Sequence, residues 1–181
     1  MEDISLHILD IAENSLAAGA TCVKISITEE TGQDLFTVTI EDNGKGMTPE
    51  FVGKALDPFC TTRTTRKVGL GLSLLAQAAR ETGGDIRIRS VAGEGTTVTA
   101  DFRPGHIDMK PLGNIADTVV TLIAGNPQAD FLFSCRRGDR SYRLDTQEIR
   151  AALEEVPLNS AEVLSAMQGD LRDALGDILN L

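Results

Sequence analysis

Hydrophobic side chains recur along the chain with two periods, one typical of helices and one typical of strands. Residues 2–19 place Ile4, Ile8 and Ile11 on one helical stripe that Ser15 continues, and the pattern stops at a glycine. Residues 23–28 and 35–41 alternate apolar and polar side chains around a turn-like segment. This half of the pattern predicts a helix followed by a hairpin.

The same pattern continues with two helices and two strands. Residues 48–56 begin with Thr48, a favourable helix N-cap, and residues 71–84 form a longer helical segment that ends at paired glycines. Alternation returns at residues 85–91 and 96–102, on either side of a short glycine-containing turn. The predicted order, α-β-β-α-loop-α-β-β, indicates an α/β fold in which helices cover one face of a sheet.

Residues 103–106, with the sequence RPGH, interrupt this pattern and suggest a boundary. We therefore divide the chain into residues 1–104 and an extension, residues 105–181. The extension is predicted to contain a helix at 113–125, a hairpin at 130–146, and helices at 146–156 and 160–179. We identify no run of catalytic polar residues in it, and its role stays open.

Charge and composition exclude several functions. The net charge is −10, from 27 acidic and 17 basic residues, so a nucleic-acid backbone would be repelled. The three cysteines are far apart and form no zinc or disulfide pattern. No apolar run is long enough to span a membrane, and the acidic start differs from a secretory signal, so we expect a cytoplasmic protein. Arg63, Arg66 and Lys67 form a local basic cluster.

Polar residues on the first helix are the first candidate site. His7, Asp10 and Asn14 share one face, which lies away from the isoleucine stripe. This face is either solvated, or it carries an amide that coordinates a metal and a carboxylate that orients or deprotonates a nucleophile.

Two glycine-rich segments are further candidates. Asp42 follows a strand, and Gly44 and Gly46 come directly after it; they form either a plain loop or a pocket in which a carboxylate accepts a hydrogen bond from an adenine amino group. Gly69 and Gly71 stand at a helix start just after the basic cluster. Free amides there favour phosphate, although glycines can also merely loosen a helix start.

The order of these motifs resembles the ATPase family of DNA gyrase, the large heat-shock chaperone, histidine kinases and MutL. The motifs are an Asn-bearing helix, DNGKGM, DPFCTTR, GLGL and GEGTT, and they cover about residues 1–103. The resemblance implies a two-layer α/β sandwich, a Bergerat-type fold, with ATP between the helices and a lid. The DPFCTTR segment is most similar to histidine kinases and anti-sigma serine kinases, although Arg63 stands where those usually carry lysine.

The resemblance also implies a role for each matching residue. Asn14 would bind Mg²⁺, Asp10 would be the catalytic carboxylate, and Asp42 would recognise the adenine amino group. The remaining nucleotide-binding residues it implies are Gly44, Gly46, Met47, Arg63, Lys67, Gly69, Leu70, Gly71 and Thr96.

Three functions follow from the resemblance. The favoured one is a stand-alone kinase that transfers the γ-phosphate of ATP to a His or Ser on a separate partner protein. Only 13 residues precede Asn14, too few for the phosphoacceptor hairpin of a histidine kinase. The alternatives are an ATP-dependent regulatory module without catalysis, similar to an anti-sigma factor, and a slow MutL-like ATPase. Related anti-sigma kinases suggest a homodimer.

Overall fold

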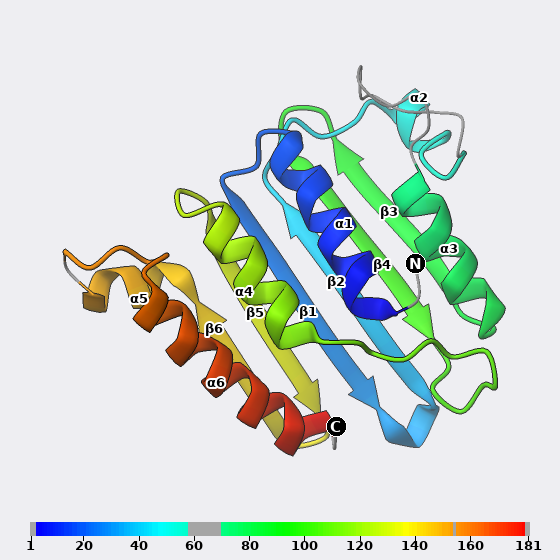
Figure 1. Cartoon of the computed structure of the whole chain (residues 1–181). Coiled ribbons are helices and arrows are strands. Elements are labelled where there is room, and N and C mark those ends of the chain that lie inside the picture. The colour runs from blue at the N-terminus through cyan, green and yellow to red at the C-terminus, as the bar shows by residue number, and fades with distance from the viewer. Residues whose placement is uncertain (1–2, 58–69, 154, 180–181) are drawn as a thin grey trace.

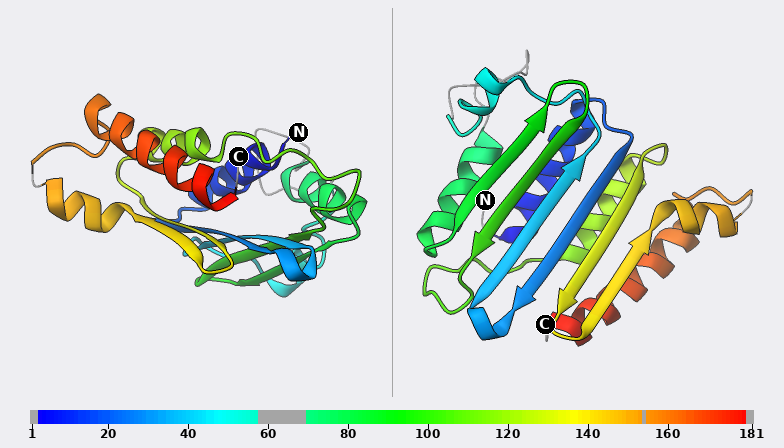
Figure 2. Two further views of the ribbon diagram at one scale, coloured as in Figure 1. Left: turned by 90° about the horizontal axis from the view of Figure 1, so that it is seen from below. Right: turned by 180° about the vertical axis from the view of Figure 1, so that it is seen from behind.

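The computed structural model describes residues 3–57, 70–153 and 155–179 and contains one six-stranded sheet. The strand order is β3-β4-β2-β1-β5-β6, and every neighbouring pair is antiparallel except β1 and β5, which run parallel. Helices α1, α3, α4 and α6 cover one face of this sheet, and none of the helices among the described residues covers the other face (Figure 1; Figure 2). The elements are α1 (Ile4–Ala17), β1 (Cys22–Glu30), a 3₁₀ turn (Thr31–Gln33), β2 (Leu35–Asp42), α2 (Pro49–Val52), α3 (Leu70–Glu81), β3 (Asp85–Val91), β4 (Gly95–Phe102), α4 (Ile115–Gly125), β5 (Asp130–Arg137), β6 (Arg140–Asp145), α5 (Thr146–Leu153) and α6 (Ala161–Leu179).

The core lies between the sheet and these helices, as the hydrophobic pattern predicts. Ile4, Ile8 and Ile11 of α1 are almost fully buried, and they pack on alternate residues of the strands below. On β2, for example, Phe36, Val38 and Ile40 are buried, whereas the residues between them face the open side. Burial of this one face fixes the register of the strands, because a slip of one residue would turn the apolar set outward.

The extension continues the same sheet. Strand β5 pairs with β1 along its whole length, and α4 packs against α1 (Figure 1). The segment before α4 also contacts the start of α1, where Ile4 and Ser5 donate backbone hydrogen bonds to the carbonyls of Pro111 and Leu112, both 3.0 Å long. The division of the chain near residue 104 stays a prediction. In the structure, the residues on either side of it share one sheet and one core.

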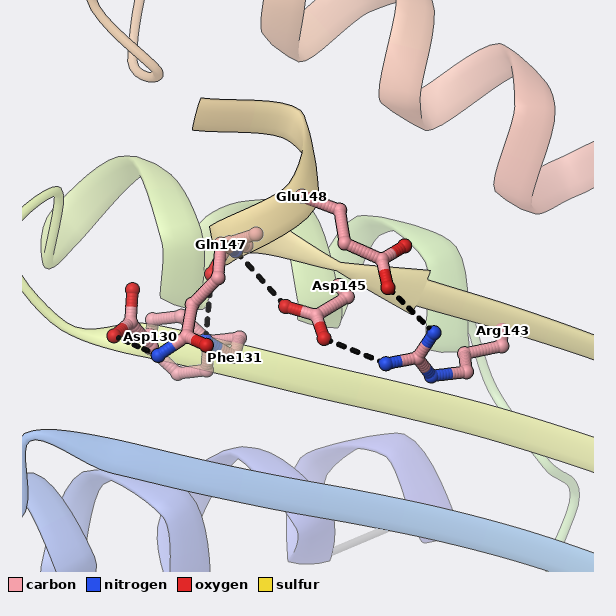
Figure 3. A network of polar contacts seen from close by, with 7 residues as sticks. Asp130, Phe131, Arg143, Asp145, Gln147 and Glu148 are labelled. Atoms are coloured by element: carbon pink, nitrogen blue, oxygen red, sulfur yellow. Dashed lines mark hydrogen bonds and ion pairs between the residues drawn. The ribbon is translucent and has the colours of Figure 1, made fainter. Parts of the chain in front are cut away.

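A polar network fixes the far end of the extension, where β5, β6 and α5 meet (Figure 3). Arg143 donates to Asp145 at 2.7 Å and to Glu148 at 2.8 Å, while Gln147 donates its side-chain amide to Asp130 at 2.7 Å. The backbone N–H of Gln147 donates to Asp145 at 2.9 Å, which satisfies one free amide at the start of α5. These contacts are structural and carry no candidate chemistry.

The predicted order of helices and strands is confirmed for the described residues through residue 102 and in the extension, whereas residues 58–69 of the predicted loop lie outside them. The helix predicted over residues 48–56 is shorter than expected, since α2 covers only Pro49–Val52, although Thr48 does cap it by accepting from the backbone N–H of Phe51. Among the described residues, no helix combines the length and apolar character that a membrane crossing requires.

Candidate functional site

Three polar side chains form a row across the helix-covered face of the sheet. Ser90 on β3 is the register partner of Thr96 on β4, and Thr96 is in turn the register partner of Asp42 on β2. All three are partly buried and occupy positions where the strand alternation otherwise places core residues. The row lies at the end of the sheet where α1 and the glycine loop after β2 meet.

The glycine loop is closely packed against this row. The backbone N–H of Gly44 donates to Asp42 Oδ1 at 2.8 Å, and a Cβ on Gly44 would lie 3.0 Å from the same oxygen. Gly46 has φ +62°, and a Cβ there would overlap the backbone carbonyl of Val91. Glycine is therefore required at position 46 both by its backbone conformation and by the approach of the next turn.

Helix α1 completes the contacts of the Asp42 carboxylate. Ser15 Oγ donates to Asp42 Oδ2 at 2.7 Å, so each carboxylate oxygen accepts one hydrogen bond from the protein. A carboxylate oxygen has two lone pairs, and each oxygen therefore keeps capacity for a further donor. The two bonds hold the Asp42 carboxylate in one orientation while leaving it able to bind a ligand donor.

The start of α3 brings together the second group of predicted residues. A Cβ on Gly71 would overlap Asp10 Oδ2, and it would lie 3.0 Å from Asp10 Cγ and 3.3 Å from Asn14 Nδ2. The first turn of α3 thus lies directly against the side chains of Asp10 and Asn14, both of which are partly buried. A side chain at position 71 would displace the Asp10 carboxylate from this position.

The two groups adjoin because Asn14 and Ser15 are consecutive on α1. Asn14 faces the start of α3, and Ser15 faces Asp42, so α1 joins the carboxylate row to the helix terminus. Met47 belongs to the row through its backbone, whose N–H donates to Ser90 Oγ at 2.8 Å. Leu70 is the first residue of α3, whereas Arg63, Lys67 and Gly69 lie outside the described residues.

His7 does not lie on a solvated face of α1, which is one of the two alternatives that the sequence left open. Its side chain is only 2% exposed, and neither ring nitrogen has a hydrogen-bond partner among the described residues. Helix α1 packs against α3 and α4 on its two sides, so its buried surface is wider than the isoleucine stripe. Burial lowers the pKa of His7, an effect that the nearby carboxylates of Asp10 and Asp3 partly oppose.

Two residues of the site, Ser15 and Ser90, were missed by the sequence analysis. Both stand where the periodicity demands an apolar residue: Ser15 continues the isoleucine stripe of α1, and Ser90 follows Ile86 and Ile88 on the buried face of β3. A hydroxyl at a core-facing position needs a hydrogen-bond partner, and this need is the signal that could have identified them.

Comparison with known protein families identifies the family to which the chain belongs. A family model described as histidine kinase-, DNA gyrase B- and HSP90-like ATPase matches residues 2–106. These residues make up more than half of the chain, which therefore belongs to this ATPase family. The chain therefore contains an enzyme domain of the kind that is also found in histidine kinases, and the order of its motifs predicted this family.

Its relatives in sequence are sensor kinases. The chain is 30% identical over 110 residues to the NtrY-like sensor histidine kinase of Rickettsia conorii, which covers 61% of this chain and 18% of that protein. It is 32% identical over 71 residues to the sensor histidine kinase ZraS of Salmonella typhimurium, covering 39% of this chain and 15% of that protein. The chain thus spans less than a fifth of the length of these relatives.

Solved structures show the same fold. The ATPase domain of MutL from Aquifex aeolicus, complexed with ADP, has a TM-score of 0.51 at 18% identity over 85% of this chain and 70% of that one. The N-terminal domain of a DNA repair protein also has a TM-score of 0.51, at 13% identity over 80% of this chain and 52% of that one. The predicted two-layer α/β sandwich is confirmed. Residues 2–106 make up less than two thirds of the chain, whereas the MutL structure matches 85% of it. The structural similarity to MutL therefore includes part of residues 105–181.

Proposed function

We propose that this chain binds ATP with Mg²⁺ and transfers the γ-phosphate to a His or Ser side chain of a separate protein. The observation that carries the proposal is the convergence of Asp10 and Asn14 on the start of α3, beside the row that ends at Asp42. Similarity to sensor histidine kinases favours phosphotransfer over other uses of ATP.

The described residues fit an adenine nucleotide. Asp42 offers carboxylate oxygens with unused acceptor capacity to the amino group of the base. Helix α3 begins next to Asn14, and the free amides and positive end of its dipole favour the phosphates. The base and the phosphates would then bind on two sides of α1's last turns.

The same residues fit a magnesium ion. The amide oxygen of Asn14 is an oxygen ligand of the kind that Mg²⁺ prefers, and the Asn14 side chain borders the start of α3. The described residues contain no cluster of three His, Cys, Asp or Glu side chains that would form an all-protein metal site. Phosphate oxygens and water would therefore supply the remaining ligands. When bound, Mg²⁺ would neutralise charge on the phosphates.

Asp10 is the residue proposed to act on the nucleophile. It would accept the proton of an incoming serine hydroxyl, or accept a hydrogen bond from the N–H of an incoming imidazole whose other, unprotonated nitrogen attacks, as the new bond to the γ-phosphorus forms. The bond between that phosphorus and the bridging oxygen breaks at the same time, and ADP leaves with the electron pair. Arg63 and Lys67 are proposed to neutralise the charge that develops on the transferred group.

The extension is proposed to bind the partner protein. It contacts α1 through α4, and the segment before α4 contacts the first turn of α1, so a protein bound to the extension would lie close to the helix that carries Asp10. We also propose a cytoplasmic location, where ATP is available, and a homodimer, which sedimentation of the purified chain would test.

Transfer of labelled phosphate tests the proposal. The purified protein is incubated with γ-labelled ATP, Mg²⁺ and lysate of its source organism, and its Asp10→Asn variant is compared with Glu13→Gln. Glu13 is an exposed acidic residue on the same helix, so this variant makes the same charge change away from the site. The proposal predicts a labelled second protein with wild type and Glu13→Gln, and its loss with Asp10→Asn.

The other outcomes identify the alternatives. Release of free phosphate without a labelled protein indicates a slow ATPase. Tight nucleotide binding with neither product indicates a regulatory module. The acid stability of the label distinguishes a phosphoserine from the acid-labile phosphohistidine.

A further inference from the structure

We infer that Ser90 fixes the direction of the Thr96 hydrogen bond and thereby restricts the base site to purines that carry a 6-amino group. The inference rests on the proposed function, because it takes the base to lie against Asp42 and Thr96. It assigns Ser90 as a positioning residue that acts through Thr96.

Ser90 Oγ has three partners, all at 2.8 Å: the backbone N–H of Met47, the carbonyl oxygen of Gly95 and the hydroxyl of Thr96. A serine hydroxyl has one proton and two lone pairs, so three partners saturate it. The amide of Met47 can only donate, and the carbonyl of Gly95 can only accept.

These constraints leave one arrangement of protons. Ser90 must give its only proton to Gly95, because two oxygens at 2.8 Å without a proton between them would repel each other. The same reasoning applies to the Ser90–Thr96 pair, where the proton must then come from Thr96. Thr96 therefore donates to Ser90, and it keeps only lone pairs for the base site.

The base site is consequently lined by acceptors. Thr96 presents lone pairs, and its register partner Asp42 presents carboxylate oxygens. A 6-amino purine offers two protons to such a surface, directly or through water. A 6-oxo purine has an acceptor in place of these two protons and keeps only N1–H as a donor on this edge, so an acceptor of the site is left unpaired, and sites of this kind discriminate strongly.

Removal of the Ser90 hydroxyl tests the inference. With alanine at position 90 the Thr96 hydroxyl is free to rotate and can donate to a 6-oxo group. We therefore expect the ratio of the affinities for ADP and inosine diphosphate, measured by calorimetry with Mg²⁺, to fall by about tenfold in Ser90→Ala, the effect of one hydrogen bond. Ser90→Thr keeps the hydroxyl and is expected to keep the wild-type ratio.

Two further variants make the test decisive. Ser134→Ala is the matched control, since it also removes a serine-to-hydroxyl bond, the 3.0 Å bond to Ser26, on the open face of the same sheet. Thr96→Val keeps the branched shape and removes the hydroxyl, so it should lower the ratio even if Ser90→Ala does not fold.

The inference is overturned if Ser90→Ala, or Thr96→Val in its place, weakens both nucleotides equally, because an unchanged ratio means a purely structural role. It is also overturned if wild type binds both nucleotides equally well. Failure of wild type to bind either nucleotide would instead refute the proposed function, and the inference with it.

Discussion

Replacing Gly71 by alanine should displace the Asp10 carboxylate and lower the rate of ATP turnover while leaving the stability of the fold almost unchanged. A Cβ at this position would overlap Asp10 Oδ2 and lie 3.0 Å from Asp10 Cγ. Since the overlapped atom is the end of a side chain, Asp10 can rotate away while the backbone stays. Alanine is favoured over glycine in a helix by up to about 1 kcal/mol, so the melting temperature should change by no more than about 4 °C.

The effect on chemistry should be far larger. The Asp10 carboxylate must move by on the order of 1 Å, and a displacement of that size costs about 100-fold in rate when a reacting group must be aligned. The assay is magnesium-dependent ATP turnover at saturating ATP, with the melting temperature measured in parallel. Gly169→Ala is the control, because it also places alanine in a helix, α6, where a Cβ would meet nothing within 4 Å.

A double-mutant cycle shows whether the effect passes through Asp10. In an Asp10→Ala background the overlapped oxygen is absent, so adding Gly71→Ala should change the affinity for ADP and Mg²⁺ little. The reasoning is refuted if Gly71→Ala leaves turnover unchanged, or if it weakens binding by the same factor with and without Asp10.

Three other substitutions test separate contacts. Gly46→Ala combines an unfavourable positive φ with a backbone overlap and should lower the unfolding free energy by about 2–5 kcal/mol. Gly19→Ala is the control, because Gly19 has φ +82° but a Cβ there would meet nothing within 4 Å, and it should cost about 1–2 kcal/mol. Equal losses of unfolding free energy in chemical denaturation would contradict this prediction. Ser15→Ala removes one donor to Asp42 and should weaken ADP binding by about tenfold in calorimetry, so unchanged affinity would argue against the orienting role. Burial lowers the pKa of His7, so the unfolded chain takes up its proton at a higher pH than the folded one. The unfolding free energy should therefore be fully present above about pH 6.5 and decline below it, and His7→Leu should flatten this decline in urea titrations; an identical slope in the variant would show that another group is responsible.

The periodicity of the sequence predicts most elements because one face of each is buried. The isoleucines of α1 and the alternating residues of β2 both lie in the core, and so their spacing identifies element and face together. The same reasoning could not decide whether His7 is solvated, because an apolar stripe identifies the centre of a buried face and does not give its width. Two neighbouring helices widen the buried face of α1 beyond that stripe.

The pairing of the extension could not be predicted in the same way. Residues 130–137 alternate as a strand should, but alternation does not reveal which strand is the neighbour. Their parallel partner, β1, lies more than a hundred residues earlier in the chain. At the site, the motifs predicted Asp42 and the glycines around it, while Ser15 and Ser90 are identified only by the oxygens they contact in space.

The central claim is that an adenine nucleotide binds with its base against Asp42, and calorimetry tests it most directly. Wild type should bind ADP in the presence of Mg²⁺ with one site per chain, and Asp42→Asn should weaken this binding by about 100-fold or more, because the amide places a donor against the amino group of the base. Asp101→Asn, on the open face of the same sheet where Asp101 pairs with Thr37 and Arg87, should bind like wild type. Equal affinity of wild type and Asp42→Asn, or no heat of binding with wild type, would contradict the account.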